Sequence, residues 1–315
     1  MLQAVWEKSG LVYAVDGSLW WAKTHAQVPT VDVLGNGRLR IYYSSRDADN
    51  KSRVGFFEAD ANNPAKVLYV HPEPILDLGP AGTFDDCGTM PSWLVKHQGK
   101  TYLYYIGWNV RNTVPYHNSV GLAVSDDGVN FRKCFTGPVM DRTAHEPYFC
   151  ATSCVLVEGG VWRNWYLSCT EWRMVDGKQE PRYHLKYAES ADGVQWERKG
   201  VVAIDYRDAN EGGIVRASVL KHGGLYKMWY CYRSHSGYRS NPANSYRIGY
   251  AESADGLVWT RQDDRSGIDV SAQGWDSFML AYPHVVDIQG LLHMFYNGNG
   301  FGSSGIGYAV QAASQ

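Results

Sequence analysis

The segments GTMPSWLVKHQG (residues 88–99), YLYYIG (102–107) and VGLAVSDDG (120–128) decide the fold of this chain. The first two are apolar runs rich in aromatic and β-branched residues, and a Gln-Gly pair separates them, which is typical of two strands joined by a tight turn. The third ends in Asp127-Gly128, a dipeptide that favours a hairpin turn. Three consecutive antiparallel strands are therefore predicted.

The same pattern recurs five times along the chain. The first strands align on Pro29, Pro91, Ser153, Ala217 and Pro283, and the second strands carry Tyr43, Tyr105, Tyr166, Tyr230 and Tyr296 at matched positions. A fourth strand follows in VNFRKCFTGPV, VQWERKGVVAI and LVWTRQ. Such self-similarity at nearly constant spacing indicates a repeat architecture. We interpret Asp192 and Asp255, in the S-A-D-G turns before the fourth strand, as structural.

The last repeat lacks a fourth strand of its own, and the N-terminus offers one. The segment VWEKSGLV (5–12) is similar to QWERKGVV (195–202), so residues 4–14 are expected to pair at the outer edge of the last repeat. Joining the two ends of the chain in one sheet removes the open edge of a linear array. The sequence predicts one all-β domain over residues 1–315, a five-bladed β-propeller with four-stranded antiparallel blades and an N-terminal strand that closes the last blade.

Composition and charge narrow the possible partners. The formal net charge is −2, so neither nucleic acid nor an anionic membrane is an expected partner. Residues 1–10 show no signal-peptide pattern and no apolar run approaches the about 20 residues that span a membrane, so a cytoplasmic location is expected. The cysteines show no metal-ligand spacing, and neither a metal nor a cofactor is expected.

One face of the predicted propeller carries the unusual residues. Loops between the second and third strands lengthen in the middle blades, and long loops on a rigid scaffold commonly carry binding residues. Acids expected to converge on an axial pocket there are Asp85, Asp86, Glu146, Glu211 and Asp276. Candidate substrate-binding residues are His25, Gln27, Arg46, Asp47, Trp108, Tyr116, Arg182, Tyr183, Arg216, Arg233, Arg239, Tyr246, Arg247, Tyr282 and Asn297. Carboxylates, arginines and aromatic rings in one concave site are typical of an active site.

Blade number, N-terminal closure and acids before the first strands make the chain resemble the five-bladed propeller glycoside hydrolases, the superfamily of families 43, 62, 32, 68 and 130. The resemblance covers residues 4–310 and implies three carboxylates, from blades I, II and III. By position, blade II offers Asp85 or Asp86 and blade III offers Glu146. Blade I departs from the family, because His25 and Gln27 stand where an acid is expected, and Asp47 is the nearest substitute.

Three functions follow from this departure. A glycosidase could use a rearranged pair, such as Asp86 with Glu211 or Glu146. A phosphorylase needs no base, because phosphate is already anionic, and His25 with arginines would hold it. A propeller that only binds sugar is the third. Our leading hypothesis is a metal-independent enzyme that acts on a glycosidic bond of a small, anionic glycan or glycoconjugate.

Overall fold

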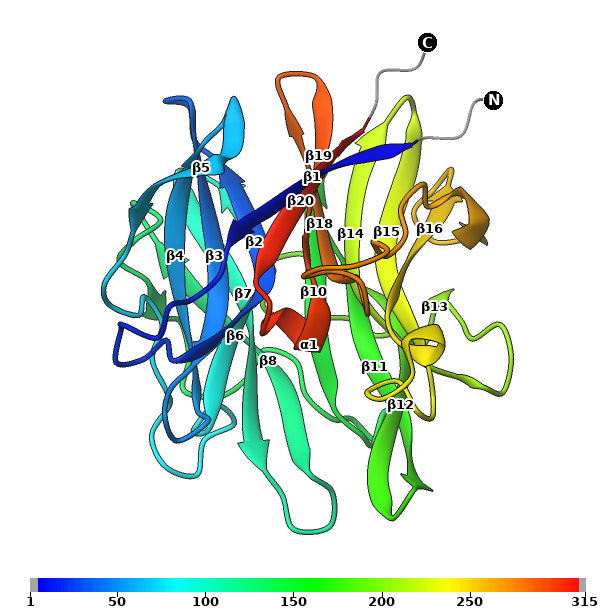
Figure 1. Ribbon diagram of the computed structural model, residues 1–315. Helices are drawn as coiled ribbons and strands as arrows, with labels where there is room; N and C mark the ends of the chain where they lie inside the picture. The colour runs from blue at the N-terminus through cyan, green and yellow to red at the C-terminus, as the bar shows by residue number, and fades with distance from the viewer. Residues whose placement is uncertain (1–4, 312–315) are drawn as a thin grey trace.

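The computed structural model describes residues 5–311, and its architecture is all-β (Figure 1). The strands are β1 (Trp6–Tyr13), β2 (Thr24–Val33), β3 (Arg38–Arg46), β4 (Ser52–Asp60), β5 (Asn63–Val70), β6 (Gly88–His97), β7 (Lys100–Val110), β8 (Tyr116–Ser125), β9 (Arg132–Lys133), β10 (Cys150–Glu158), β11 (Val161–Val175), β12 (Lys178–Ser190), β13 (Val202–Ile204), β14 (Glu211–His222), β15 (Leu225–Ser234), β16 (Arg247–Ser253), β17 (Thr260–Arg261), β18 (Ala281–Ile288), β19 (Leu291–Asn297) and β20 (Ile306–Gln311). Short helical turns are η1 (Pro242–Asn244), η2 (Asp263–Arg265) and α1 (Asn299–Gly302).

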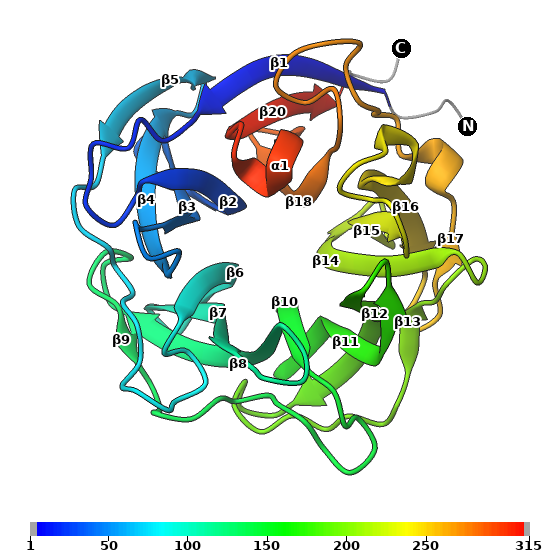
Figure 2. The same cartoon turned by 60° about the horizontal axis from the view of Figure 1, so that its bottom comes forward.

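The strands of residues 5–311 form consecutive antiparallel meanders, in the order β2-β3-β4-β5, β6-β7-β8-β9, β10-β11-β12-β13, β14-β15-β16-β17 and β18-β19-β20-β1. Figure 2 shows these meanders arranged around a common axis, with β2, β6, β10, β14 and β18 innermost. Single parallel pairs, Ser52 with Gly88 and Tyr183 with Gly213, join neighbouring meanders into larger sheets. The predicted pairing of the N-terminus is confirmed, because β1 pairs with β20 from Trp6 with Gln311 to Tyr13 with Ile306. Residue 4 lies outside the described residues.

The repeated tyrosine and glycine columns form cross-strand pairs. Tyr105 lies opposite Gly121, and Tyr230 lies opposite Gly249 in the same way. A Cβ built on Gly121 would lie 2.2 Å from the Tyr105 ring, so only glycine admits the tyrosine here. The aromatic ring can therefore lie flat across the neighbouring strand and fill the space between two meanders.

Ser-x-Asp-Gly turns occur at residues 125–128, 190–193 and 253–256, and each connects its meander to the preceding one. The Asp192 carboxylate accepts the backbone N–H groups of Val194 and Gln195, and the Gly193 carbonyl accepts the Tyr104 hydroxyl at 2.7 Å. Asp255 accepts two backbone N–H groups in the equivalent turn, and the Trp165 indole donates to the Gly256 carbonyl. The structural interpretation of Asp192 and Asp255 is confirmed.

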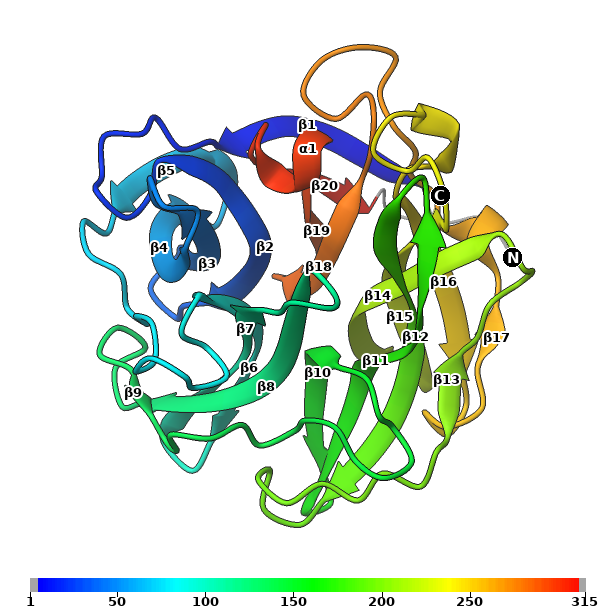
Figure 3. The ribbon, with the colours of Figure 1, turned by 90° about the horizontal axis from the view of Figure 1, so that it is seen from below.

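The innermost strands share an irregularity near the axis. Register shifts interrupt each of their pairings, as between Pro91 and Trp93 in β6 and between Ala151 and Ser153 in β10. Equivalent shifts occur in β2, β14 and β18. A β-bulge re-aims the following side chains and increases the local twist. Figure 3 shows the face of the ring that carries the β7–β8 and β11–β12 connections.

Candidate functional site

A cavity of about 690 Å³ lies at the axis, on the face that carries the β3–β4, β7–β8 and β11–β12 connections. Nine of the predicted substrate-binding residues line it: His25, Gln27, Arg46, Trp108, Tyr116, Tyr183, Arg239, Tyr246 and Tyr282. They come from strands β2, β3, β7, β8, β12 and β18 and from the loop between β15 and β16. The prediction of an axial pocket built from several repeats is confirmed.

Strained backbone positions the residues on one side of the pocket. His25, Val28 and Tyr282 have φ values of 65°, 55° and 55°, in the left-handed region that non-glycine residues rarely adopt. The Asn297 side chain holds residues 26–28 of β2 in place, because it accepts the Val28 N–H and donates to the Ala26 carbonyl. Asn297 therefore supports the pocket from behind and is absent from its lining, contrary to prediction.

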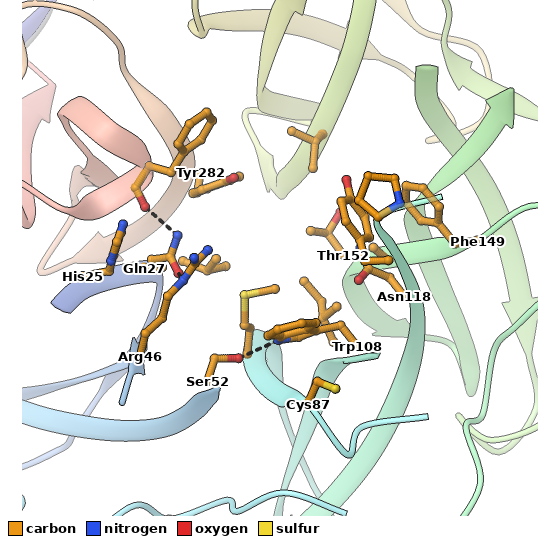
Figure 4. Close-up of a pocket in the computed structure, with 18 of the residues that line it drawn as sticks. His25, Gln27, Arg46, Ser52, Cys87, Trp108, Asn118, Phe149, Thr152 and Tyr282 are labelled. Carbon is orange, nitrogen blue, oxygen red and sulfur yellow. Dashed lines mark hydrogen bonds between the residues drawn. The ribbon is translucent and has the colours of Figure 1, made fainter. Parts of the chain in front are cut away.

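Arg46 provides a positive charge without an acidic partner. Its Nε donates to Gln27 Oε1 at 3.3 Å and its Nη1 donates to Asn50 Oδ1 at 2.9 Å, and both acceptors are neutral amides. No ion pair to Arg46 occurs within residues 5–311. Figure 4 shows Arg46, Gln27 and His25 together, facing Phe149 and Asn118 across the pocket. Arg46 is therefore available to an anionic ligand group.

His25 adds no charge at neutral pH. Burial, together with the neighbouring Arg46 guanidinium, lowers the pKa of His25 to about 4. Its Nδ1 lies 2.9 Å from Thr24 Oγ1. His25 can thus donate or accept hydrogen bonds as a neutral imidazole, and the charge of this side of the pocket comes from the cations Arg46 and Lys51.

Aromatic side chains form much of the remaining wall. Tyr183 and Tyr246 hydroxyls lie 2.5 Å apart, and Arg233 stands behind them with its Nε donating to the Tyr183 hydroxyl at 3.2 Å. The Trp108 indole donates to Ser52 Oγ at 2.7 Å, which fixes its ring against the pocket. Apolar faces edged with hydroxyl groups suit a sugar ring.

The predicted catalytic acids do not converge on this pocket, and that expectation is wrong. Asp85, Glu146, Glu211 and Asp276 are all buried between the meanders and none of them lines the cavity. Three accept a hydrogen bond from the repeated second-strand tyrosine, as Tyr105 donates to Asp85, Tyr166 to Glu146 and Tyr296 to Asp276.

Each of these acids also pairs with a cation from the outer part of its meander. The pairs are Lys133 with Asp85 at 2.6 Å, Arg198 with Glu146 at 3.4 Å, Arg261 with Glu211 at 2.6 Å and Lys8 with Asp276 at 2.8 Å. The acid, the tyrosine and the cation form a repeated buried network, which accounts for an acid before each of these first strands. The acids are satisfied there, so the repeat explains them without chemistry on a substrate.

Asp86 also lies outside the cavity lining, although its neighbour Cys87 belongs to it. Asp86 Oδ2 accepts the Gly82 N–H at 2.8 Å, and its buried Oδ1 has no hydrogen-bond partner among the described residues. Asp49 is the one carboxylate in the lining over residues 5–311, and it lies at the exposed β3–β4 turn. The pocket therefore offers one acid instead of the pair that glycoside hydrolysis commonly uses.

The other predicted binding residues are held by the protein itself. Asp47 pairs with Arg53 at 2.5 Å, and Arg182 lies in strand β12 rather than a loop, with its Nε donating to the Glu211 carbonyl. Arg247 donates to the Phe278 carbonyl and pairs with Asp269. Arg216 and Arg233 are fully buried. These side chains are absent from the lining of the axial pocket, where the prediction placed them.

Several residues of the lining are not predicted from the sequence: Asp49, Lys51, Asn118, Phe149, Thr152, Tyr238 and Phe301. Asp49 and Lys51 lie in the turn that follows Arg46. The polar sequence of this turn, R-D-A-D-N-K, could have indicated them as lining residues. Phe301, in the G-N-G-F-G segment, has a φ of 57°, and its carbonyl accepts the Gln27 amide. Nothing in the repeat pattern marks Phe301, because α1 belongs only to the last meander.

Two further observations concern residues 5–311 as a whole. Their His, Cys, Asp and Glu side chains form no group of three placed to hold a metal ion. Within the same residues, none of the helical segments has both the length and the apolar character needed to cross a bilayer. The cytoplasmic location stays a prediction.

No protein-family model matches the chain. The uncharacterized proteins MT1551 and Rv1502, from two strains of Mycobacterium tuberculosis, are each 37% identical to it over 305 residues, which cover 97% of this chain and 98% of each relative.

Among solved structures, a glycosyl hydrolase from Bacteroides ovatus matches with a TM-score of 0.75 at 15% identity, over 100% of this chain and 97% of the other. A thermostable family-43 glycoside hydrolase gives 0.66 at 18% identity, over 96% and 93% of the two chains. A GH130 glycoside hydrolase that targets β-1,2 mannosidic linkages in Candida mannan gives 0.70 at 14% identity, over 100% and 97%. The chain has the fold of these propeller glycoside hydrolases and belongs to the family of the two uncharacterized M. tuberculosis proteins.

Proposed function

We propose that this protein is a carbohydrate-active, five-bladed propeller that binds a small anionic glycan or glycoconjugate in its axial pocket. The observation that carries the proposal is Arg46, a half-buried guanidinium in the lining whose hydrogen-bond partners among residues 5–311 are the neutral amides of Gln27 and Asn50. A carboxylate or phosphate on the ligand would supply the missing acceptor in a charge-assisted, two-bond contact.

The aromatic wall supports a sugar as the body of the ligand. Trp108, Tyr183 and Tyr246 contribute aromatic rings, and the two tyrosines also hydroxyl groups, to the lining of the same cavity of about 690 Å³. Such a volume is in the range of pockets that enclose small molecules. The glycoside hydrolase fold is consistent with a carbohydrate ligand, although a fold alone does not give function.

A second candidate function is phosphorolysis of a glycosidic bond, and the single carboxylate in the pocket favours it over hydrolysis. Phosphate would be held by Arg46 and Lys51 and its oxygen would form the new bond to the anomeric carbon. The bond to the leaving sugar oxygen would break, and Asp49, the carboxyl group in the lining, would be the group that passes a proton to that oxygen. One acid suffices for this reaction, whereas hydrolysis commonly needs two.

Calorimetric titration tests the binding proposal. Glucuronic acid, galacturonic acid, mannuronic acid and glucose 1-phosphate are compared with glucose and mannose, for the wild type and for Arg46→Gln. We expect at least one anionic sugar to bind the wild type and to lose about 10- to 100-fold in affinity in Arg46→Gln. Arg38→Gln is the matched control and should bind the sugar normally, because Arg38 lies at the other end of β3 and pairs with Glu58. Equal binding by Arg46→Gln would overturn the proposal.

Turnover separates the two candidates. A panel of aryl glycosides is assayed with and without inorganic phosphate, using the wild type and Asp49→Asn. Release that requires phosphate and is lost in Asp49→Asn supports phosphorolysis. A wild type that is inert on every glycoside, yet binds the anionic sugar, rules out the enzymatic candidate for these substrates and leaves binding as the function.

A further inference from the structure

Arg216 lies at the centre of the molecule, where the innermost strands meet. It belongs to β14, has a φ of 62° and is fully buried. Its Nη2 donates to the Pro29 carbonyl at 2.8 Å and to Thr30 Oγ1 at 3.0 Å, both in β2, and lies 3.0 Å from His284 Nδ1 in β18. Its backbone N–H approaches Thr152 Oγ1 of β10 at 3.4 Å. The guanidinium also lies 5.7 Å from the centre of the Trp93 ring in β6, so Arg216 contacts all of the innermost strands.

The positive charge of Arg216 has no counter-charge. No carboxylate pairs with it within residues 5–311, and two of its nitrogens, Nε and Nη1, are buried without a hydrogen-bond partner there. His284 supplies an acceptor but no negative charge, and burial beside the guanidinium lowers the pKa of His284 far below its usual range. Burying a charge is costly unless it is paired and its hydrogen bonds are made.

Arg233 shows that this situation is not general in the protein. It is equally buried, yet its Nε, Nη1 and Nη2 donate to the Tyr183 hydroxyl, the Ser234 carbonyl and the Pro181 carbonyl. The guanidinium also lies 3.8 Å from the centre of the Tyr238 ring, whose negative face stabilises a cation. The chain therefore accommodates one buried arginine completely and leaves the other with unused donors.

The position of Arg216 places these donors between two cavities. Its neighbours Thr152, Val215 and Val28 line the axial pocket. On the other side, its contacts Trp93 and His284 line a second cavity of about 490 Å³, toward the opposite face of the ring. Arg216 thus lies between the two cavities, and its own side chain lines neither of them.

We propose that Arg216 forms an axial site for a small inorganic anion such as chloride, separate from the glycan-binding Arg46. A monoatomic anion accepts hydrogen bonds from any direction, so it can use Nε or Nη1 without the planar geometry that a carboxylate requires. A water molecule could accept the same bonds, but it would leave the charge uncompensated. The anion would stabilise the junction of the inner strands by neutralising the cation that touches all of them.

Diffraction from crystals of the wild type grown or soaked in sodium bromide tests the site directly. We expect an anomalous bromide peak within hydrogen-bond distance of Arg216 Nε or Nη1, and its replacement by chloride on back-soaking. A water molecule at that position, or no bromide at the guanidinium in the presence of bromide elsewhere, would overturn the proposal. This result does not depend on any variant's ability to fold.

Thermal unfolding tests the site in solution. Chloride replaces gluconate at constant ionic strength, and a site that binds only the folded state should raise the unfolding temperature saturably, by about 5 °C at a hundredfold excess over Kd. Arg216→Met should lose this dependence, whereas Arg38→Gln should keep it. A chloride response of the same size in Arg216→Met would contradict the proposal, and phosphate in place of chloride shows whether larger anions can enter.

Discussion

Charged side chains are paired in the spaces between the meanders, whereas in the axial pocket one of them is unpaired. Between the meanders, Glu146 and its equivalents are buried acids, each with a cation and most with a tyrosine hydroxyl. In the pocket, Arg46 is a cation without an acid. The repeated charges are satisfied inside the protein, whereas Arg46 has no acidic partner among residues 5–311, which is why we propose that it meets a ligand. An acid that recurs at the same place in a repeat is therefore a weak indication of catalysis.

The largest effect is expected from Glu146→Gln. The substitution leaves Arg198 and Lys186 near one another without their shared acid, and removing one partner of a buried ion pair costs about 3–5 kcal/mol. Urea unfolding should show this loss as a lower midpoint. Glu197→Gln is the control, because its pair with Lys199 is exposed and worth about 0–1 kcal/mol. Equal stability of the two variants would remove the distinction between the two regions.

Arg46→Ala should keep the stability of the wild type and lose affinity for the sugar. Removing a cation that has no acid should leave the free energy of unfolding unchanged within about 0.5 kcal/mol, as for substitutions outside critical contacts. The same variant should bind the anionic sugar about 10- to 100-fold more weakly, and Arg46→Lys should recover part of the loss because it keeps the charge but not the planar fork. Urea unfolding and calorimetry on the same samples give both numbers. A large loss of stability in Arg46→Ala would show that this arginine supports the fold.

The pH dependence of the free energy of unfolding tests the protonation of His25, which lies beside Arg46. In the unfolded chain this imidazole takes up a proton near pH 6.5, but in the folded chain only near its pKa of about 4. The unfolded state therefore binds more protons between pH 6.5 and 4, and stability falls as the pH drops through that window. The fall should be smaller in His25→Asn than in the wild type, by urea unfolding at several pH values. Parallel curves would show that His25 is not shielded from protonation.

The smallest effect is expected from Asp192→Ala, which removes the acceptor for two backbone N–H groups in an exposed turn. Loss of such a cap costs about 1 kcal/mol. Sugar binding should not change, because the turn lies on the side of the sheets away from the pocket lining. Weaker sugar binding in this variant would show that the two faces are coupled.

The sequence predicts the strands well because their determinants are local or repeated. Tyr105 and Gly121 recur at matched positions, and the similarity of residues 5–12 to 195–202 predicts the pairing of β1 with β20. The axial site is harder to predict. A shift of one residue reverses the side to which a strand residue points, and a bulge such as that between Ala281 and His284 leaves no clear mark in the sequence.

The same limit explains the errors about particular residues. Asp85 and Glu146 precede the first strands, as a catalytic acid could, but they turn between the meanders toward Lys133 and Arg198, which are distant in the sequence. Arg46 was predicted because it ends a second strand on the face that carries the long loops. Its lack of an acidic partner is a property of the folded chain and is visible only in three dimensions.

Sugar binding by folded Glu146→Gln tests whether the buried acids are separate from the ligand site. The anionic sugar that binds the wild type most tightly in the panel is titrated into this variant by calorimetry, at a temperature where circular dichroism shows it to be folded. We expect a Kd within about twofold of the wild type, a difference of about 0.4 kcal/mol, because Glu146 belongs to the network between the meanders. Loss of binding in the folded variant would contradict the account and would return Glu146 to the ligand site.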